Sequence, residues 1–199
     1  MPASLCFAIA VTAVYTGQPI VGSLFLVAFC GLLRVGEALA LTWDAIYFSD
    51  TAVALVLART KRGIEQKVAL ENPCVVSWFR TYRDRYQHLS ARVFPVSYHK
   101  VNYWLRKLTQ QFGFHDVKFS SHSLRRGGAS ELVRLRVPVA DICLFGRWAS
   151  HSSASEYMRR GEVFIMRLKG SHPEARWSQL EHLASIGHRV WDFIDQPSD

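Results

Sequence analysis

The sequence predicts an α+β fold that is mainly α-helical, with one small antiparallel three-stranded sheet. Apolar and aromatic residues recur at helical spacing over most of the 199 residues, and strand signals are confined to the short stretches 45–48, 52–58 and 64–70. The chain is 49% hydrophobic and 20% charged, so it can build a substantial core, and wholesale disorder is excluded.

The elements follow in a simple order. Two apolar helices are expected first, at 3–15 and 20–33, and the TGQP turn separates them. A short helix at 35–41 precedes the strands, and Gly63 supplies the turn between the last two strands. The remaining helices are expected at about 75–86, 101–112, 123–136, 138–145, 152–160 and 162–168, followed by an amphipathic stretch at 177–194.

Two of these helices carry stripes of aromatic residues. The stripes consist of Val75, Trp78, Phe79, Tyr82 and Tyr86, and of Val101, Trp104, Leu105, Leu108 and Phe112. Such stripes could form a platform on which nucleic-acid bases stack. Their helical spacing favours a place in the core instead.

The first 33 residues contain no ionisable side chain. A signal peptide would carry basic residues before its apolar run, and a membrane-spanning helix needs about 20 continuous apolar residues. Both apolar runs are shorter, which favours two buried helices. A membrane-associated helical protein remains the alternative for this segment.

The formal net charge of +8 indicates a polyanionic partner, either nucleic acid or an acidic membrane surface. All of this excess lies in residues 34–157, because the basic and acidic residues after Tyr157 cancel. The four cysteines show no metal-ligand spacing, so buried thiols in a reducing compartment are expected.

Several basic residues stand in unusual settings. Arg34 directly follows the most apolar part of the chain, where its guanidinium needs an anion or hydrogen-bond acceptors. Glu37, one turn further on, is the partner expected if the role of Arg34 is purely structural. Lys61 stands on the tip of the hairpin between Arg59 and Arg62. Serines before His122 predict a helix start, whose free N–H groups favour a phosphate.

Further along, Arg125 lies one turn after His122 on the same helix face. A turn at 146–148 then precedes Tyr157, whose neighbours one turn away are Ser153 and Gly161 rather than apolar residues. This setting favours a tyrosine hydroxyl that faces a site.

The order of these residues resembles the tyrosine recombinase (phage integrase) family. The matching stretches are GLLRVGEALAL (31–41), TKRG (60–63), HSLRRGGAS (122–130) and GRW (146–148), followed by Tyr157. The resemblance covers residues 3–168 and implies that family's catalytic-domain fold. The GRW variant looks most like recombinases of mobile elements.

The resemblance implies DNA strand cleavage and rejoining through a 3′-phosphotyrosine intermediate, without metal or another cofactor. Tyr157 would attack the scissile phosphate, whose charge Arg34 and Arg125 would neutralise. His122 would bind the phosphate or act as general base, and Lys61 would protonate the leaving 5′ oxygen. Trp148 would offer its indole N–H to the phosphate. Further DNA contacts are expected from Arg59, Arg62, Arg126 and Arg147.

The same resemblance sets expectations for organisation and partners. Residues 1–168 would form the catalytic domain and 169–199 a helical tail that docks in cis or in trans, with the family's N-terminal core-binding domain absent. The partner would be double-stranded DNA, with self-association on it, and neither a membrane nor a small-molecule substrate. The protein would be intracellular, in the nucleus if it is eukaryotic and in the cytoplasm if it is bacterial or from a phage. An inert DNA-binding relic of a recombinase is the alternative function.

Overall fold

The computed structural model describes residues 1–57, 66–187 and 191, apart from the side chain of Ser153. Its helices are α1 (Ala3–Tyr15), α2 (Pro19–Cys30), α3 (Val35–Leu39), α4 (Pro73–Tyr86), α5 (Tyr98–Gln111), α6 (Ser121–Arg134), α7 (Val139–Phe145), α8 (His151–Gly170) and α9 (Glu174–Ser185). Two short 3₁₀ helices occupy Trp43–Ala45 and Gln87–Leu89.

Three strands, β1 (Ile46–Phe48), β2 (Val53–Leu57) and β3 (Gln66–Leu70), form one antiparallel sheet in the order β1-β2-β3. The pairing of Leu57 with Gln66 sets the register of β2 and β3. The mainly helical fold with a three-stranded antiparallel sheet is therefore confirmed. Arg59, Lys61 and Arg62 lie outside the described residues.

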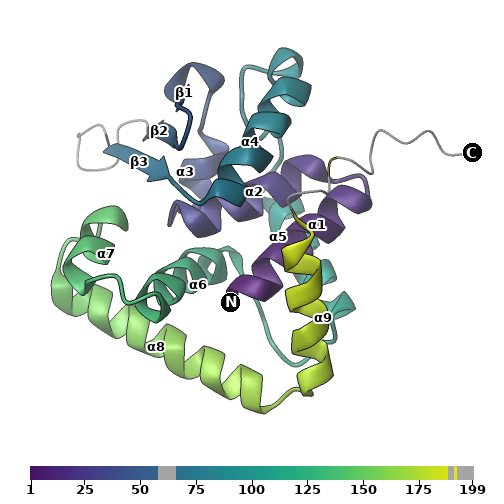
Figure 1. Ribbon diagram of the computed structural model, residues 1–199, viewed down its shortest axis with the longest axis vertical. Helices are drawn as coiled ribbons and strands as arrows, with labels where there is room; N and C mark the ends of the chain where they lie inside the picture. Colours follow the sequence, from purple (N-terminus) through teal and green to yellow (C-terminus); the bar gives the residue numbers. More distant parts are fainter. Residues whose placement is uncertain (58–65, 188–190, 192–199) are drawn as a thin grey trace, which may run out of the picture.

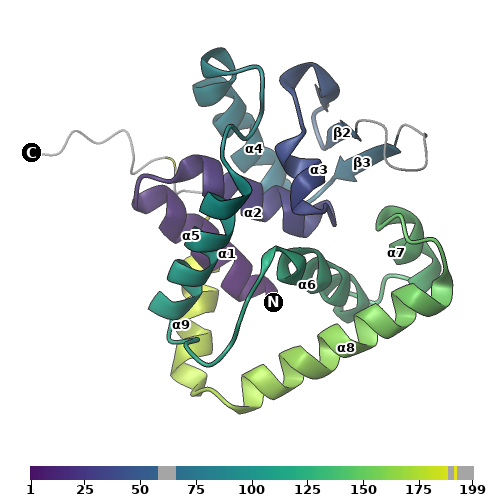
Figure 2. The ribbon, with the colours of Figure 1, turned by 180° about the vertical axis from the view of Figure 1, so that it is seen from behind.

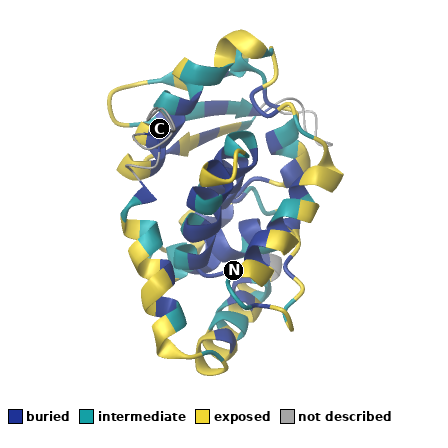
Figure 3. Cartoon of the chain, turned by 90° about the vertical axis from the view of Figure 1, so that its right-hand side faces the viewer, coloured by how far each residue is buried: buried dark blue, intermediate teal, exposed yellow. Residues whose placement is uncertain are grey.

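The uncharged segment at the start of the chain forms the centre of the core. α1 and α2 pack against each other, and α6, α5 and α9 pack around α1 (Figure 1). Most residues of α1 and α2 are buried, whereas the surrounding helices carry more of the exposed positions (Figure 3). Within the described part of the chain, no helix combines the length and apolar character needed to cross a membrane.

The aromatic stripe of α4 is core, as its spacing predicted. Trp78, Phe79 and Tyr82 are each at most 3% exposed. Their polar atoms are satisfied inside: the Trp78 indole donates to Ser23 Oγ at 2.8 Å, and the Tyr82 hydroxyl donates to the Val93 carbonyl at 2.6 Å. Buried polar groups with such partners carry little net cost.

One boundary differs from the sequence prediction. The expected break between 160 and 162 does not occur, because α8 runs unbroken through Gly161. A Cβ at Gly161 would collide with Ser130 Oγ of α6. The glycine thus serves the close packing of α8 on α6, which is visible from both sides of the molecule (Figures 1 and 2).

The last helix packs within the same chain. α9 lies along α1, with Trp177 and Leu180 buried. It begins three residues before the predicted amphipathic stretch and ends at Ser185. Beyond it, Trp191 is 4% exposed and meets the Trp78 ring edge-on at a centroid distance of 5.3 Å.

The cysteines match the thiol prediction in part. All four are free: Cys6 and Cys143 are buried, Cys30 is partly buried and Cys74 is exposed.

Candidate active site

The site begins at the turn that follows α2. Leu32 adopts a left-handed backbone conformation with φ of 48°, and its side chain is fully buried. A non-glycine residue in this region carries roughly 1 kcal/mol of strain or more. The turn places Arg34 at the N-cap of α3, with its side chain 54% exposed.

Glu37 holds Arg34 in place. Its Oε2 accepts the backbone N–H of Arg34 at 2.7 Å, and its Oε1 accepts the guanidinium Nη1 at 2.7 Å. The sequence predicted this partnership. The exposed remainder of the Arg34 guanidinium is free to face solvent or an anion.

Arg125 reaches the same turn from α6. It is 4% exposed, and its Nη1 donates to the Leu32 carbonyl at 2.6 Å while its Nη2 donates to the Gly146 carbonyl. One guanidinium thus links the turn after α2 to the turn after α7. Burial, and then the charges of Arg34 and Arg147, lower the pKa of Arg125 to about 10, so it remains a cation at neutral pH.

The Arg147 side chain is enclosed in the same cluster. The residue has φ of 58°, and its side chain is only 6% exposed. Nη2 donates to Glu37 Oε2 at 2.8 Å and to the Leu32 carbonyl at 3.0 Å, and Nη1 donates to the Phe145 carbonyl at 3.1 Å. These bonds make Arg147 an internal support of the site, and its contact with DNA stays a prediction.

The carboxylate of Glu37 therefore lies among arginines. Burial alone would raise its pKa. The hydrogen bond from the Arg34 backbone and the charges of Arg147 and Arg34 outweigh burial and hold the pKa below its usual value. Arg125 Nη1 is also 3.9 Å from Oε2.

Trp148 lies between Arg125 and Tyr157. Its ring lies 4.6 Å from the Arg125 guanidinium carbon, and its centroid is 5.5 Å from that of Tyr157. The absence of a side chain at Gly146 leaves room for the indole. Trp148 thus supplies a packing surface shared by Arg125 and Tyr157.

Tyr157 projects from the first turns of α8 toward α6. Its hydroxyl donates to the backbone carbonyl of His122 at 3.4 Å, and its side chain is partly buried. Burial raises its pKa, while the charges of Arg126, Arg125 and Arg34 act in the opposite direction. The His122 ring is on an exposed residue in the first turn of α6, which a Ser120–Ser123 capping box begins.

Arg126 is partly buried and lies beside Tyr157, and its predicted contact with DNA stays a prediction. Its guanidinium carbon lies 4.9 Å from the centroid of the Tyr157 ring. The structure therefore brings together Arg34, Arg125, Trp148 and Tyr157, with His122 beside the tyrosine. The sequence reasoning did not identify the inward orientation of Arg126 and Arg147.

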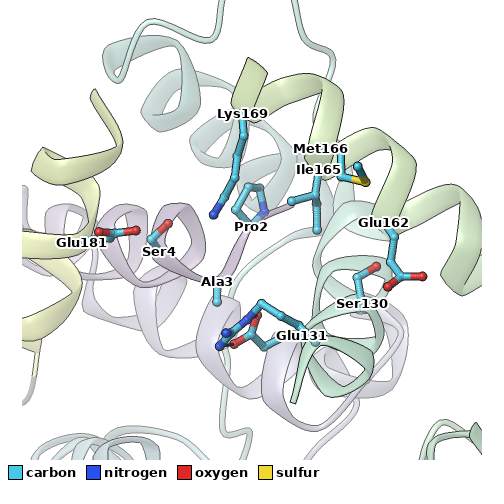
Figure 4. Close-up of a pocket in the computed structure, with 11 residues that line it drawn as sticks. Pro2, Ala3, Ser4, Ser130, Glu131, Glu162, Ile165, Met166, Lys169 and Glu181 are labelled. Atoms are coloured by element: carbon cyan, nitrogen blue, oxygen red, sulfur yellow. Dashed lines mark hydrogen bonds and ion pairs between the residues drawn. The ribbon is translucent and has the colours of Figure 1, made fainter. Parts of the chain in front are cut away.

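A pocket of about 470 Å³ lies elsewhere, between the start of α1 and helices α6, α8 and α9 (Figure 4). Pro2, Glu162 and Lys169 are among its lining residues, and the described candidate site residues are not. The candidate site is thus an open surface cluster rather than this pocket. Among the described residues, no group of three His, Cys, Asp or Glu side chains could hold a metal ion.

The fold is that of a tyrosine recombinase catalytic domain. The chain belongs to the phage integrase family, whose model matches residues 19–162. No curated protein matches the chain.

Solved recombinase structures resemble the fold at low sequence identity. XerH recombinase, bound to its difH substrate in a pre-cleavage complex, matches with a TM-score of 0.66 and 16% identity over 83% of this chain and 51% of that one. XerA recombinase matches with a TM-score of 0.65 and 17% identity over 87% and 65%. A lambda integrase dimer bound to a COC′ core site matches with a TM-score of 0.63 and 14% identity over 79% and 58%. The chain thus spans about half to two thirds of these recombinases.

Proposed function

We propose that this chain is the catalytic domain of a site-specific DNA recombinase, with Tyr157 as the nucleophile. The observation that carries the proposal is the convergence of Arg34, Arg125 and Tyr157 from three separate elements, with Trp148 packed between Arg125 and Tyr157. The structures of XerH and lambda integrase contain their DNA sites, which supports double-stranded DNA as the partner here.

In the proposed step, Tyr157 Oη forms a bond to phosphorus while the bond from phosphorus to the 5′ oxygen breaks. The phenolic proton passes to His122, and Lys61 protonates the 5′ oxygen. The arginine charges stabilise the negative charge on the non-bridging oxygens in the transition state. The product is a 3′-phosphotyrosine, which conserves the energy of the phosphodiester for rejoining.

Arg34 and Arg125 suit different parts of this task. Arg34 is half exposed, so its guanidinium can bind a phosphate oxygen directly. Arg125 is already fixed by two carbonyls and by Trp148, so it offers its remaining N–H groups with little loss of conformational freedom.

The test has two stages. DNA bound by the Tyr157→Phe variant is first selected from a random duplex pool. The selected sequence is then prepared with a nick just beyond the cleavage position, so that the short fragment with the freed 5′ hydroxyl diffuses away and rejoining is prevented. The unchanged chain should form a covalent adduct with this DNA, which digestion and mass spectrometry locate on Tyr157.

Tyr103→Phe is the matched control, because Tyr103 is 57% exposed on α5 and takes no part in the cluster. It should retain adduct formation, whereas Tyr157→Phe should bind DNA and form none. Binding without any adduct from the unchanged chain would favour the inert DNA-binding relic. Binding should weaken steeply with salt, because phosphate contacts release counterions.

A further inference from the structure

The partly buried side chain of Arg126 lies against the ring of Tyr157. Its guanidinium carbon lies 4.9 Å from the centroid of the Tyr157 ring, within the range of an attractive cation–π contact. Its Nε is enclosed and meets no hydrogen-bond acceptor in the described part of the chain. An enclosed N–H without an acceptor is unfavourable, so the contact with the ring is the interaction that compensates for this orientation.

The facing helix leaves a path for this side chain. Gly161 lies one turn after Tyr157 on the same face of α8. A Cβ there would stand 3.1 Å from Arg126 Cγ and 3.6 Å from Cδ. The stem of Arg126 therefore crosses α8 at the glycine, and its head then lies over the tyrosine.

Three arginines on two other elements act on the charge of Tyr157. α6 contributes Arg125 and Arg126, and the turn after α2 contributes Arg34. On its own helix, the neighbouring carboxylate of Glu156 is paired with Arg159 at 2.8 Å and with Arg160 at 2.6 Å.

These cations have different tasks once DNA is bound. Arg34 and Arg125 are assigned to the phosphate in the proposed function. Arg126 is the cation that lies against the face of the ring, where it interacts more strongly with a phenolate than with a neutral phenol.

We propose that Arg126 is a positioning residue for Tyr157, holding the ring on α6 and stabilising the phenolate that develops as Oη bonds to phosphorus and the phenolic proton leaves for His122. This role rests on the proposed function for the identity of the nucleophile. The glycine at 161 is part of the same device, because it lets the arginine stem reach the ring.

The test places 3-fluorotyrosine at position 157 of the full chain and follows its single ¹⁹F resonance against pH, without DNA. Arg126→Gln should raise the ionisation midpoint by about one pH unit, since a nearby opposite charge typically changes a pKa by about 1–3. The midpoint of Arg126→Lys should lie between those of the unchanged chain and Arg126→Gln. Gly161→Ala should also raise the midpoint, because its methyl group displaces the Arg126 stem.

Arg159→Gln is the matched control, because it removes the same charge two residues from Tyr157 but at a side chain that is 71% exposed. An Arg126→Gln midpoint equal to that of this control would overturn the proposal. Should Arg126→Gln fail to fold, as judged by circular dichroism, the Arg126→Lys midpoint is compared with that of Arg159→Gln, and equal midpoints would again overturn the proposal.

Covalent capture separates this proposal from the function on which it rests. Capture by the unchanged chain together with an unmoved midpoint refutes the role of Arg126 and leaves the recombinase function standing. A raised midpoint with no capture refutes the function, and with it the role of Arg126 in cleavage.

Discussion

Replacing Glu37 with glutamine removes a carboxylate that lies among Arg34, Arg125 and Arg147. Glu37 accepts three hydrogen bonds of 2.7–2.8 Å, two from Arg34 and one from Arg147, and its side chain is 14% exposed. Removing one partner of a buried ion pair typically costs about 3–5 kcal/mol. Because some exposure remains and glutamine keeps one acceptor oxygen, we expect the lower end, about 3 kcal/mol.

The pH dependence of this loss has a defined sign. The folded-state pKa of Glu37 lies below its usual value, so the folded chain binds fewer protons at this group than the unfolded chain. Its contribution is therefore complete above the unfolded value of about 4.3 and is lost as the pH falls through the folded pKa. The stability difference between the unchanged chain and Glu37→Gln should be greatest near neutrality and should shrink below about pH 4.

Urea unfolding followed by circular dichroism measures this difference over the pH series, and thermal melts should show a midpoint lower by about 6–12 °C at neutral pH. The control is Glu156→Gln, since Glu156 also pairs with two arginines but on an exposed surface, where little change is expected. A Glu37→Gln loss that is the same at every pH, or no larger than that of the control, would refute the reasoning.

Substitutions at four further positions test the packing of the site. Gly128→Ala should destabilise the fold by about 1–3 kcal/mol in thermal melts, because its methyl group would collide with the backbone of α2. Gly36→Ala, where a Cβ meets nothing within 4 Å, should be neutral or slightly stabilising. Arg147→Gly should relieve a left-handed backbone yet still lose about 2 kcal/mol in urea unfolding, since Glu37 loses a partner. Trp148→Ala should lower the yield of covalent DNA adduct by about tenfold or more, whereas Trp148→Phe should retain most of it because it keeps a ring over the guanidinium.

The fold was predictable where local pattern and burial agree. The aromatic stripe of α4 follows one helix face, and Trp78 and Tyr82 are buried as that pattern requires. Gly161 shows where local pattern fails. A glycine lowers helix propensity, but the helix continues through it because tertiary packing on α6 requires a residue without a side chain.

The sequence named the residues that the structure brings together, but it did not show how two of the arginines are oriented. Arg125 and Arg126 are neighbours in the chain, as are Arg147 and Trp148, and composition does not show which of them turn inward. Arg147 pairs with Glu37 across 110 positions of sequence, and Arg126 meets a ring on another helix. Such long-range partners leave no periodic signal in the chain.

The carbonyl of Leu32 explains why these orientations matter for the chemistry. It accepts from Arg125 at 2.6 Å and from Arg147 at 3.0 Å, and it belongs to the strained turn that sets the position of Arg34. The arginines assigned to the phosphate are therefore not independent, because one of them helps to place the other. A loss of activity on replacing Arg125 would combine its own missing contact with a displaced Arg34, so single-variant losses cannot be added as separate contributions. The turn at Leu32 is thus the structural element through which the site acts as a unit.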